Sequence, residues 1–126
     1  MSIVQYASGL LIDIEFLKDL KERYPDLLIV GDGTQFLGAH HFHFDTAPFD
    51  VVVASGYKWM LAGFGNGVLM ISQAYLDRIR QKKTVLYKRV FNGHFNILAA
   101  VSLKFAVSAF EEQGFDKLIL QKEKLT

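Results

Sequence analysis

The chain has 126 residues, and 51% of them are hydrophobic. Its 14 basic and 13 acidic side chains leave a net charge of +1, so no basic field points to nucleic acid or an anionic membrane. It contains no cysteine, which excludes disulfides, thiolate metal sites and a cysteine nucleophile within these residues. It shows neither a signal peptide nor an apolar run of the roughly 18 residues that span a bilayer, so we expect a soluble cytoplasmic protein.

The first part of the sequence alternates short apolar runs with one amphipathic stretch. Residues 3–6 form a β-prone run that ends at a Ser-Gly turn. A helix is predicted over residues 14–24, with Asp13 as its N-cap and Pro25 as its stop. Residues 27–30 are continuously apolar, which is typical of a buried parallel strand.

The middle of the sequence predicts two more strands and a helix. Residues 51–54 and 68–71 are wholly apolar and read as buried strands, with a glycine-rich turn between them. Ser72 is then predicted to cap a helix over residues 73–80. A polar connection follows and leads into the last part of the chain.

The last part of the sequence is helical. A long amphipathic helix is predicted over residues 96–113, with Gly114 as its C-cap, and Asp116 starts one more helix. Strands alternate with helices, and the apolar runs of the strands lack a two-residue period. The sequence therefore predicts an α/β fold with a mostly parallel sheet and helices on both of its faces.

Polar residues of unusual kinds follow two of the predicted strands. Asp32 comes after the apolar run at 27–30. Ser55, Tyr57 and Lys58 come after the run at 51–54. In open α/β sheets, ligands bind beyond the carboxyl ends of the strands, so these side chains are expected to meet in one crevice if the strands are close.

This set of side chains has a specific chemical use. A lysine amine in a partly desolvated pocket has a depressed pKa and can form a Schiff base with an aldehyde. An aspartate can pair with a protonated pyridine nitrogen, and hydroxyl groups can hold a phosphate. The ligand that matches all three groups is pyridoxal 5′-phosphate.

The segments VGDGTQFLGA and FDVVVASGYKWMLAGFGNGVLMIS carry a family resemblance. They resemble the class V aminotransferases, a branch of the fold-type I pyridoxal-phosphate enzymes that includes cysteine desulfurases and kynureninases. The family pattern reads Asp-x-x-Gln, an apolar strand, Ser-Gly-His/Tyr-Lys and a Gly-rich strand. The resemblance covers most of the chain and implies the large domain of a fold-type I transferase.

The resemblance also assigns roles to residues of this chain. It implies that Lys58 forms the internal aldimine with the cofactor and that Asp32 pairs with the pyridine nitrogen. It implies that Gln35 hydrogen-bonds the phenolic oxygen of the cofactor. Ser55 and Tyr57 are expected to bind the phosphate, with Tyr57 in place of the commoner histidine, as in kynureninase-like members.

The same resemblance leads to expectations about assembly and domains. Many relatives have Gly-Thr where this chain has Gly93-His94, and His94 is therefore a candidate contact to the phosphate of a partner subunit in a homodimer. Residues 1–126 are expected to be a central part of the cofactor-binding large domain. An N-terminal segment and a C-terminal small domain are expected to lie outside them, so the isolated chain is expected to be inactive.

Each candidate also has a plainer interpretation. Taken alone, Lys58 is a surface lysine and Asp32 a turn residue. The cluster of His40, His41 and His43 invites a metal site, but no second group of ligands accompanies it, so a structural role is favoured. The glycines near residue 65 lack the strand-and-helix setting of a dinucleotide loop.

We therefore expect a pyridoxal-phosphate enzyme that acts on an amino acid or keto acid, in the first place an aminotransferase. A kynureninase-like or desulfurase-like lyase and an epimerase of the same family remain open. A second hypothesis is a non-catalytic fragment or assembly module that retains the site residues. A third is an unrelated flavodoxin-like binding domain, for which the turn after the first strand is too short to hold a phosphate.

Overall fold

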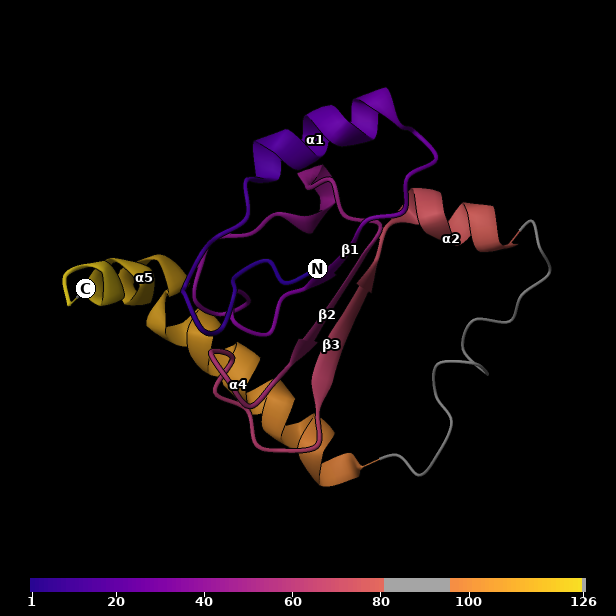
Figure 1. Ribbon diagram of the computed structural model, residues 1–126. Helices are drawn as coiled ribbons and strands as arrows, with labels where there is room; N and C mark the ends of the chain where they lie inside the picture. Colours follow the sequence, from indigo (N-terminus) through magenta and orange to yellow (C-terminus); the bar gives the residue numbers. More distant parts are fainter. Residues whose placement is uncertain (81–95, 126) are drawn as a thin grey trace.

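The computed structural model describes residues 1–80 and 96–125. The predicted polar connection after residue 80 therefore lies outside the described residues. The elements follow one another in this order: α1 (Ile14–Arg23), β1 (Val30–Asp32), the short 3-10 helix η1 (Phe44–Thr46), β2 (Val51–Ser55), β3 (Gly67–Ile71), α2 (Gln73–Arg80), α4 (Ile97–Gln113) and α5 (Phe115–Glu123) (Figure 1).

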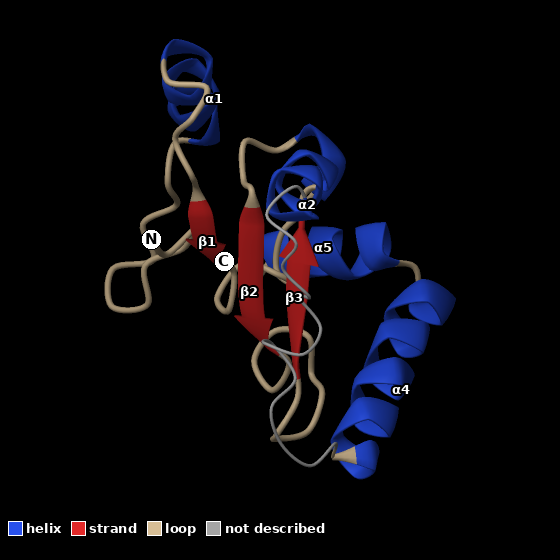
Figure 2. Cartoon of the chain, turned by 90° about the vertical axis from the view of Figure 1, so that its right-hand side faces the viewer, coloured by secondary structure: helices blue, strands red, loops and turns tan. Residues whose placement is uncertain are grey.

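The three strands form one mixed sheet in the order β1-β2-β3 (Figure 2). β1 runs parallel to β2, with Val30 opposite Val51, and β3 runs antiparallel to β2. The predicted α/β class is confirmed, but the third predicted strand is reversed. A parallel neighbour needs a crossover, usually a helix. Residues 56–66 contain no helix and only turn back, so β3 returns beside β2 in the opposite direction.

Polar caps set the beginnings of three helices. The Asp13 carboxylate accepts the Phe16 N–H at 3.0 Å, and the Ser72 hydroxyl accepts the Tyr75 N–H at 3.2 Å. Both predicted caps are thereby confirmed. The side-chain amide oxygen of Asn96 caps α4 by accepting the Ala99 N–H. It thereby satisfies one of the N–H groups that the first turn of a helix leaves unpaired.

The core lies between α1 and one face of the sheet. Its buried members come from the N-terminal run, α1, the approach to β1, the loop after β1, the approach to β2, and β2 itself: Ile3, Leu17, Ile29, Phe36, Phe49 and Val52. Side chains of a strand alternate between the two faces of its sheet, so Val53 points away from this core. Val30, Val53 and Leu69 lie on the other face of the sheet and remain partly exposed.

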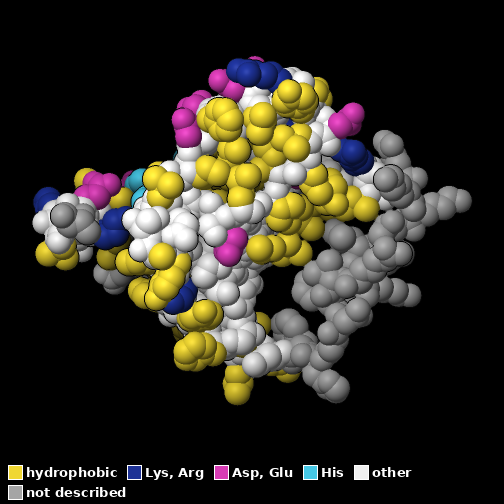
Figure 3. Space-filling model, in the orientation of Figure 1, with side chains coloured by type: hydrophobic (Ala, Val, Ile, Leu, Met, Phe, Trp, Pro, Cys, Tyr) yellow, Lys and Arg dark blue, Asp and Glu magenta, His cyan; other side chains and the backbone are white. Residues whose placement is uncertain are grey.

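Hydrophobic side chains are also abundant on the surface. Figure 3 shows them spread over much of one face of the molecule, while Lys, Arg, Asp and Glu gather mostly at its margins. The described helices include none that is long and apolar enough to cross a membrane. The cytoplasmic location stays a prediction.

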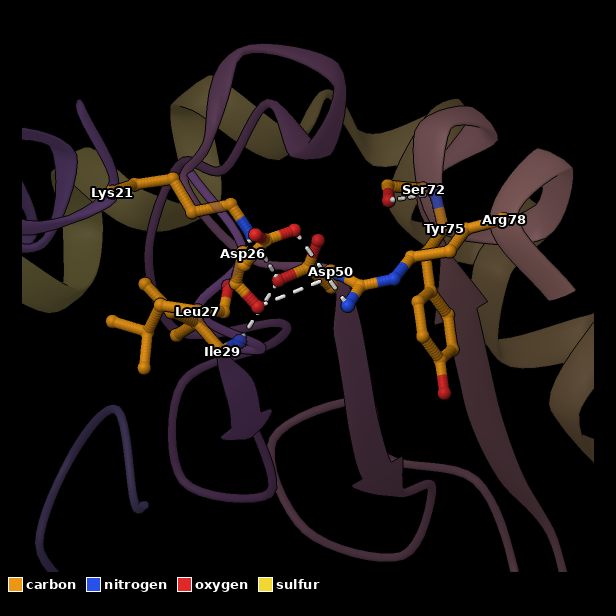
Figure 4. Close-up of polar contacts among 8 residues, drawn as sticks. All are labelled: Lys21, Asp26, Leu27, Ile29, Asp50, Ser72, Tyr75 and Arg78. Carbon is orange, nitrogen blue, oxygen red and sulfur yellow. Dashed lines mark hydrogen bonds and ion pairs between the residues drawn. The ribbon is translucent and has the colours of Figure 1, made fainter. Parts of the chain in front are cut away.

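The predicted strand at 27–30 begins three residues later, and Asp50 explains the shift. The Asp50 carboxylate, buried before β2, accepts the Ile29 N–H at 2.8 Å and the Lys21 ammonium at 2.5 Å (Figure 4). Lys21 also donates to the Leu27 carbonyl at 2.5 Å. A side chain thus takes the N–H that a strand ladder would use. This network lies at the start of the parallel strands, opposite to the end at which Asp32 lies.

Candidate functional site

A cleft of about 290 Å³ opens at the carboxyl end of β1 and β2. We call it the strand-end cleft, and its lining residues are Ser2, Val4, Tyr6, Asp32, Thr34, Gln35, Ser55 and Tyr57. Four of the predicted site residues are among them, so the structure brings together what the sequence placed after two separate strands. The volume lies near the lower end of the roughly 300–1,000 Å³ usual for small-molecule sites.

Asp32 reaches the cleft as the last residue of β1. Parallel pairing sets it opposite Val53, and the following Gly33 N–H donates to the Val53 carbonyl at 2.8 Å. One carboxylate oxygen of Asp32 accepts the Thr34 N–H at 2.9 Å. This Asx-type turn orients the carboxylate while the side chain stays exposed to the cleft.

Ser55 ends β2 and lies on the other wall of the cleft. Its N–H donates to the Thr34 hydroxyl at 3.2 Å, and this bond ties the end of β2 to the loop after β1. Tyr57 lies two residues further along the chain, with its ring centroid 5.1 Å from that of Phe64. The two hydroxyl groups therefore border the cleft from a segment that is held in place by its neighbours.

Lys58 reaches toward the cleft from beyond its lining. Its ammonium lies 5.4 Å from the ring centroid of Tyr6 and 5.5 Å from that of Tyr57. A cation at this distance from an aromatic face is attracted by the ring quadrupole. Because both rings line the cleft, the partly buried amine is held at its edge.

Gln35 is oriented by a residue that the sequence analysis passed over. The Trp59 indole N–H donates to the Gln35 amide oxygen at 3.1 Å. Because an indole N–H only donates, this contact identifies which end of the amide is oxygen. The amide nitrogen of Gln35 is therefore the end left to donate a hydrogen bond within the cleft.

The histidine-rich stretch forms no metal site in the described part of the chain, which holds no group of three metal-ligating side chains. His40 stacks on Phe36, and burial, followed by the charge of Lys122, lowers its pKa. His41 packs edge-on against Phe115 and lies 3.7 Å from the carboxylate of Asp116. His41 thus connects the loop after β1 with α5, which is a structural role.

The structure leaves one predicted site residue outside the described part of the chain and adds two residues to the cleft. His94 lies outside the described residues, so its proposed contact to a partner is untested. Tyr6 and Thr34 line the cleft without having been singled out. Thr34 stood within the Asp-x-x-Gln motif and could have been found there, whereas Tyr6 lies far from the motif and enters only through the fold.

A family model described as aminotransferase class V matches residues 1–126. The chain belongs to the class V aminotransferases. Comparison with curated protein sequences finds no match. Enzymes of this family bind pyridoxal phosphate, and the cofactor predicted from the strand-end residues is thus the cofactor of the family.

Solved structures share the fold of this class V chain at low sequence identity. Alanine–glyoxylate aminotransferase from Nostoc sp. has a TM-score of 0.81 and 14% identity, over 98% of this chain and 36% of its own. Ureidoglycine–glyoxylate aminotransferase from Bacillus subtilis has a TM-score of 0.77 and 14% identity, over 94% of this chain and 34% of its own. Phosphoserine aminotransferase from Cytophaga hutchinsonii has a TM-score of 0.72 and 19% identity, over 98% of this chain and 38% of its own. The chain therefore spans little more than a third of these relatives' length.

The residues of the strand-end cleft fit the family cofactor in chemistry. A carboxylate suits a protonated ring nitrogen, and the free amide nitrogen of Gln35 suits a ring oxygen. The hydroxyl groups of Ser55 and Tyr57 suit phosphate oxygens. The amine of Lys58, at the edge of the same cleft, suits an aldehyde.

Proposed function

We propose that this chain carries the cofactor-attachment site of a pyridoxal-phosphate-dependent aminotransferase acting on an amino acid and a keto acid. The observation that carries the proposal is the meeting of Asp32, Gln35, Ser55 and Tyr57 in one cleft with Lys58 at its edge. The three solved relatives named above are all aminotransferases, which favours group transfer over the lyase alternatives.

The proposal assigns a role to each of these residues. When bound, pyridoxal phosphate supplies an electron sink for a substrate whose Cα loses a proton. Asp32 holds a proton at the ring nitrogen, and Gln35 donates to the ring oxygen. Ser55 and Tyr57 bind the phosphate. The amine of Lys58 holds the cofactor before the substrate arrives and then moves the Cα proton.

The wider organisation is part of the same proposal. We infer that residues 1–126 form part of the cofactor-binding large domain, as their coverage of the solved relatives supports. We further infer a homodimer in which His94 approaches the cofactor phosphate of the partner.

The proposal is tested by locating the lysine that carries the cofactor. The full-length protein is incubated with pyridoxal phosphate, reduced with borohydride and digested for peptide mapping. The label is expected on Lys58, and Lys58→Ala is expected to abolish both the label and turnover. Lys18→Ala removes an exposed lysine of α1, paired with Glu15 at 2.7 Å, and is the matched control. A label that persists in Lys58→Ala would overturn the assignment.

A further inference from the structure

The turn that presents Lys58 lacks regular structure of its own. Two backbone hydrogen bonds fold it: the Leu61 N–H donates to the Lys58 carbonyl, and the Ala62 N–H donates to the Gly56 carbonyl, both at 2.9 Å. Leu61 has a φ of +55°, in the left-handed region that a bulky side chain disfavours. A strained turn persists only where its surroundings hold it, so contacts from outside the turn must stabilise it.

Asn66 supplies such contacts from the glycine-rich segment before β3. Its backbone carbonyl accepts the Gly56 N–H at 3.2 Å. Its side-chain nitrogen donates to the Gly63 carbonyl at 2.8 Å and to the Ala99 carbonyl of α4 at 3.0 Å. One residue thus connects the start of the Lys58 turn with α4, which lies beside the loop in Figures 1 and 2.

The amide oxygen of Asn66 is buried and has no hydrogen-bond partner among the described residues. The orientation of this amide follows from its neighbours, because only a nitrogen can donate to the carbonyl groups of Gly63 and Ala99. The oxygen lies against Gly56, where an added Cβ would collide with it. Burying an unpaired acceptor is unfavourable, and its position against the glycine before Tyr57 and Lys58 indicates a constraint beyond simple packing.

A second contact from α4 supports the same segment. The Ser102 hydroxyl accepts the Gly63 N–H at 2.8 Å. Asn66 and Ser102 together hold the glycine-rich segment along the first turns of α4. The chain of contacts runs from α4 through Asn66 to Gly56, and from there to Lys58.

We propose that Asn66 is a positioning residue that holds the turn of residues 56–61, and with it the Lys58 amine, on helix α4. The proposal rests on the assignment of Lys58 as the cofactor-bearing lysine. Ser102 supports Asn66 through Gly63. In this proposal both residues act through the placement of Lys58.

Asn66→Asp is the sharpest test because it keeps the shape of the side chain and removes both N–H donors. In the cofactor-free full-length protein, amide exchange at Gly56 and Ala62 is expected to become at least about tenfold faster, because the two hydrogen bonds that Asn66 donates to Gly63 and Ala99 are lost. Affinity for pyridoxal phosphate is expected to fall about tenfold as well. Affinity for pyridoxamine phosphate, which has no aldehyde to react with Lys58, is expected to stay unchanged.

Asn96→Asp is the matched control. It makes the same chemical change at the N-cap of α4, where the side-chain oxygen, which aspartate keeps, accepts the Ala99 N–H at 3.1 Å. Exchange and both affinities are expected to remain as in the wild type. An equal effect of Asn96→Asp would assign the change to the added charge and overturn the proposal.

The outcomes separate this proposal from the assignment of Lys58. Unchanged exchange at Gly56 in folded Asn66→Asp overturns the positioning role, whichever lysine carries the cofactor. An equal loss of affinity for both cofactor forms also overturns it, because the effect then does not act through Lys58. If Asn66→Asp does not fold, Ser102→Ala decides by the same measurements: faster exchange with selective loss of pyridoxal phosphate supports the proposal, and no change overturns it.

Discussion

Asp32 shows how a single residue gains its role from its neighbours. It ends β1, lies opposite Val53 and has one carboxylate oxygen held by the Thr34 N–H. A carboxylate that is already oriented loses little freedom when a ligand binds, which favours affinity. Gln35 is prepared in the same way by Trp59, which occupies its oxygen and leaves its nitrogen.

The role of Asp32 can be tested by Asp32→Asn in the full-length protein. The amide keeps the size of the side chain but cannot hold a proton on the ring nitrogen, so turnover is expected to fall strongly. Cofactor binding is expected to weaken by roughly 1.5–3 kcal/mol, the usual worth of a hydrogen bond to a charged group. Spectroscopic titration with pyridoxal phosphate and a transamination assay measure the two effects.

Asp19→Asn makes the same change at an exposed position of α1 and is expected to leave turnover and cofactor affinity unchanged. Turnover of Asp32→Asn within a factor of two of the wild type would contradict the assignment.

At the scale of elements, a partly buried ion pair between Lys21 and Asp50 joins α1 to the start of β1 and β2. Asp50 is 9% exposed, and its carboxylate accepts hydrogen bonds from the Lys21 ammonium and the Ile29 N–H (Figure 4). Its backbone N–H donates to the Ile29 carbonyl, and its backbone carbonyl accepts the Ser72 N–H. The pairing of β1 with β2 starts from this point. The carboxyl ends of the same strands carry Asp32 and Ser55, so the network also sets the register of the site.

Asp50→Ala is expected to lower the free energy of unfolding by roughly 1.5–3 kcal/mol or more, because it leaves the Ile29 N–H and the Lys21 ammonium without their acceptor. Denaturant unfolding of the full-length protein measures the change. Asp26→Ala is the matched control.

Asp26 lies in the same region, 3.8 Å from Arg78, but its side chain is fully exposed, so solvent screens the pair and its loss is expected to leave the stability almost unchanged. Equal destabilisation by the two variants would show that the buried network has no special weight.

At the scale of the whole molecule, apolar side chains remain on the surface. Helix α4 exposes Leu98 at 83% and Phe105 at 72%, and the sheet exposes Val53 and Leu69. Monomeric proteins rarely expose large apolar patches, which usually mark association surfaces. We therefore expect part of this apolar surface to take part in association.

We expect the chain of 126 residues, expressed alone, to self-associate at tens of micromolar. Sedimentation velocity tests this, and a monodisperse monomer would contradict it. The double substitution Leu98→Lys and Phe105→Lys is expected to reduce the association, because it places charges on the exposed face of α4.

Phe16→Lys changes an exposed aromatic residue of α1 and is the control. The same loss of association in Phe16→Lys would show that α4 is not the surface responsible. A transamination assay on the same sample is expected to show no turnover.

The sequence by itself determined the α/β class, the caps at Asp13 and Ser72, the helix at residues 73–80 and the motif that identifies the family. These features depend on local signals: capping side chains, apolar periodicity and residues a few positions apart. The meeting of Asp32 and Ser55 in one cleft was also predictable, because ligands of open α/β sheets bind beyond the carboxyl ends of the strands.

Only the tertiary structure decided the direction of β3, the later start of β1 and the position of Tyr6. Each depends on a contact between residues distant in sequence: Asp50 takes the Ile29 N–H, and the loop after β2 turns back instead of crossing over. Asn66 belongs to the same group, since its two bonds to Gly63 and Ala99 exist only once α4 has packed against the loop. Local patterns carry no information about such partners, because the free energy of these contacts is gained only when the chain has folded.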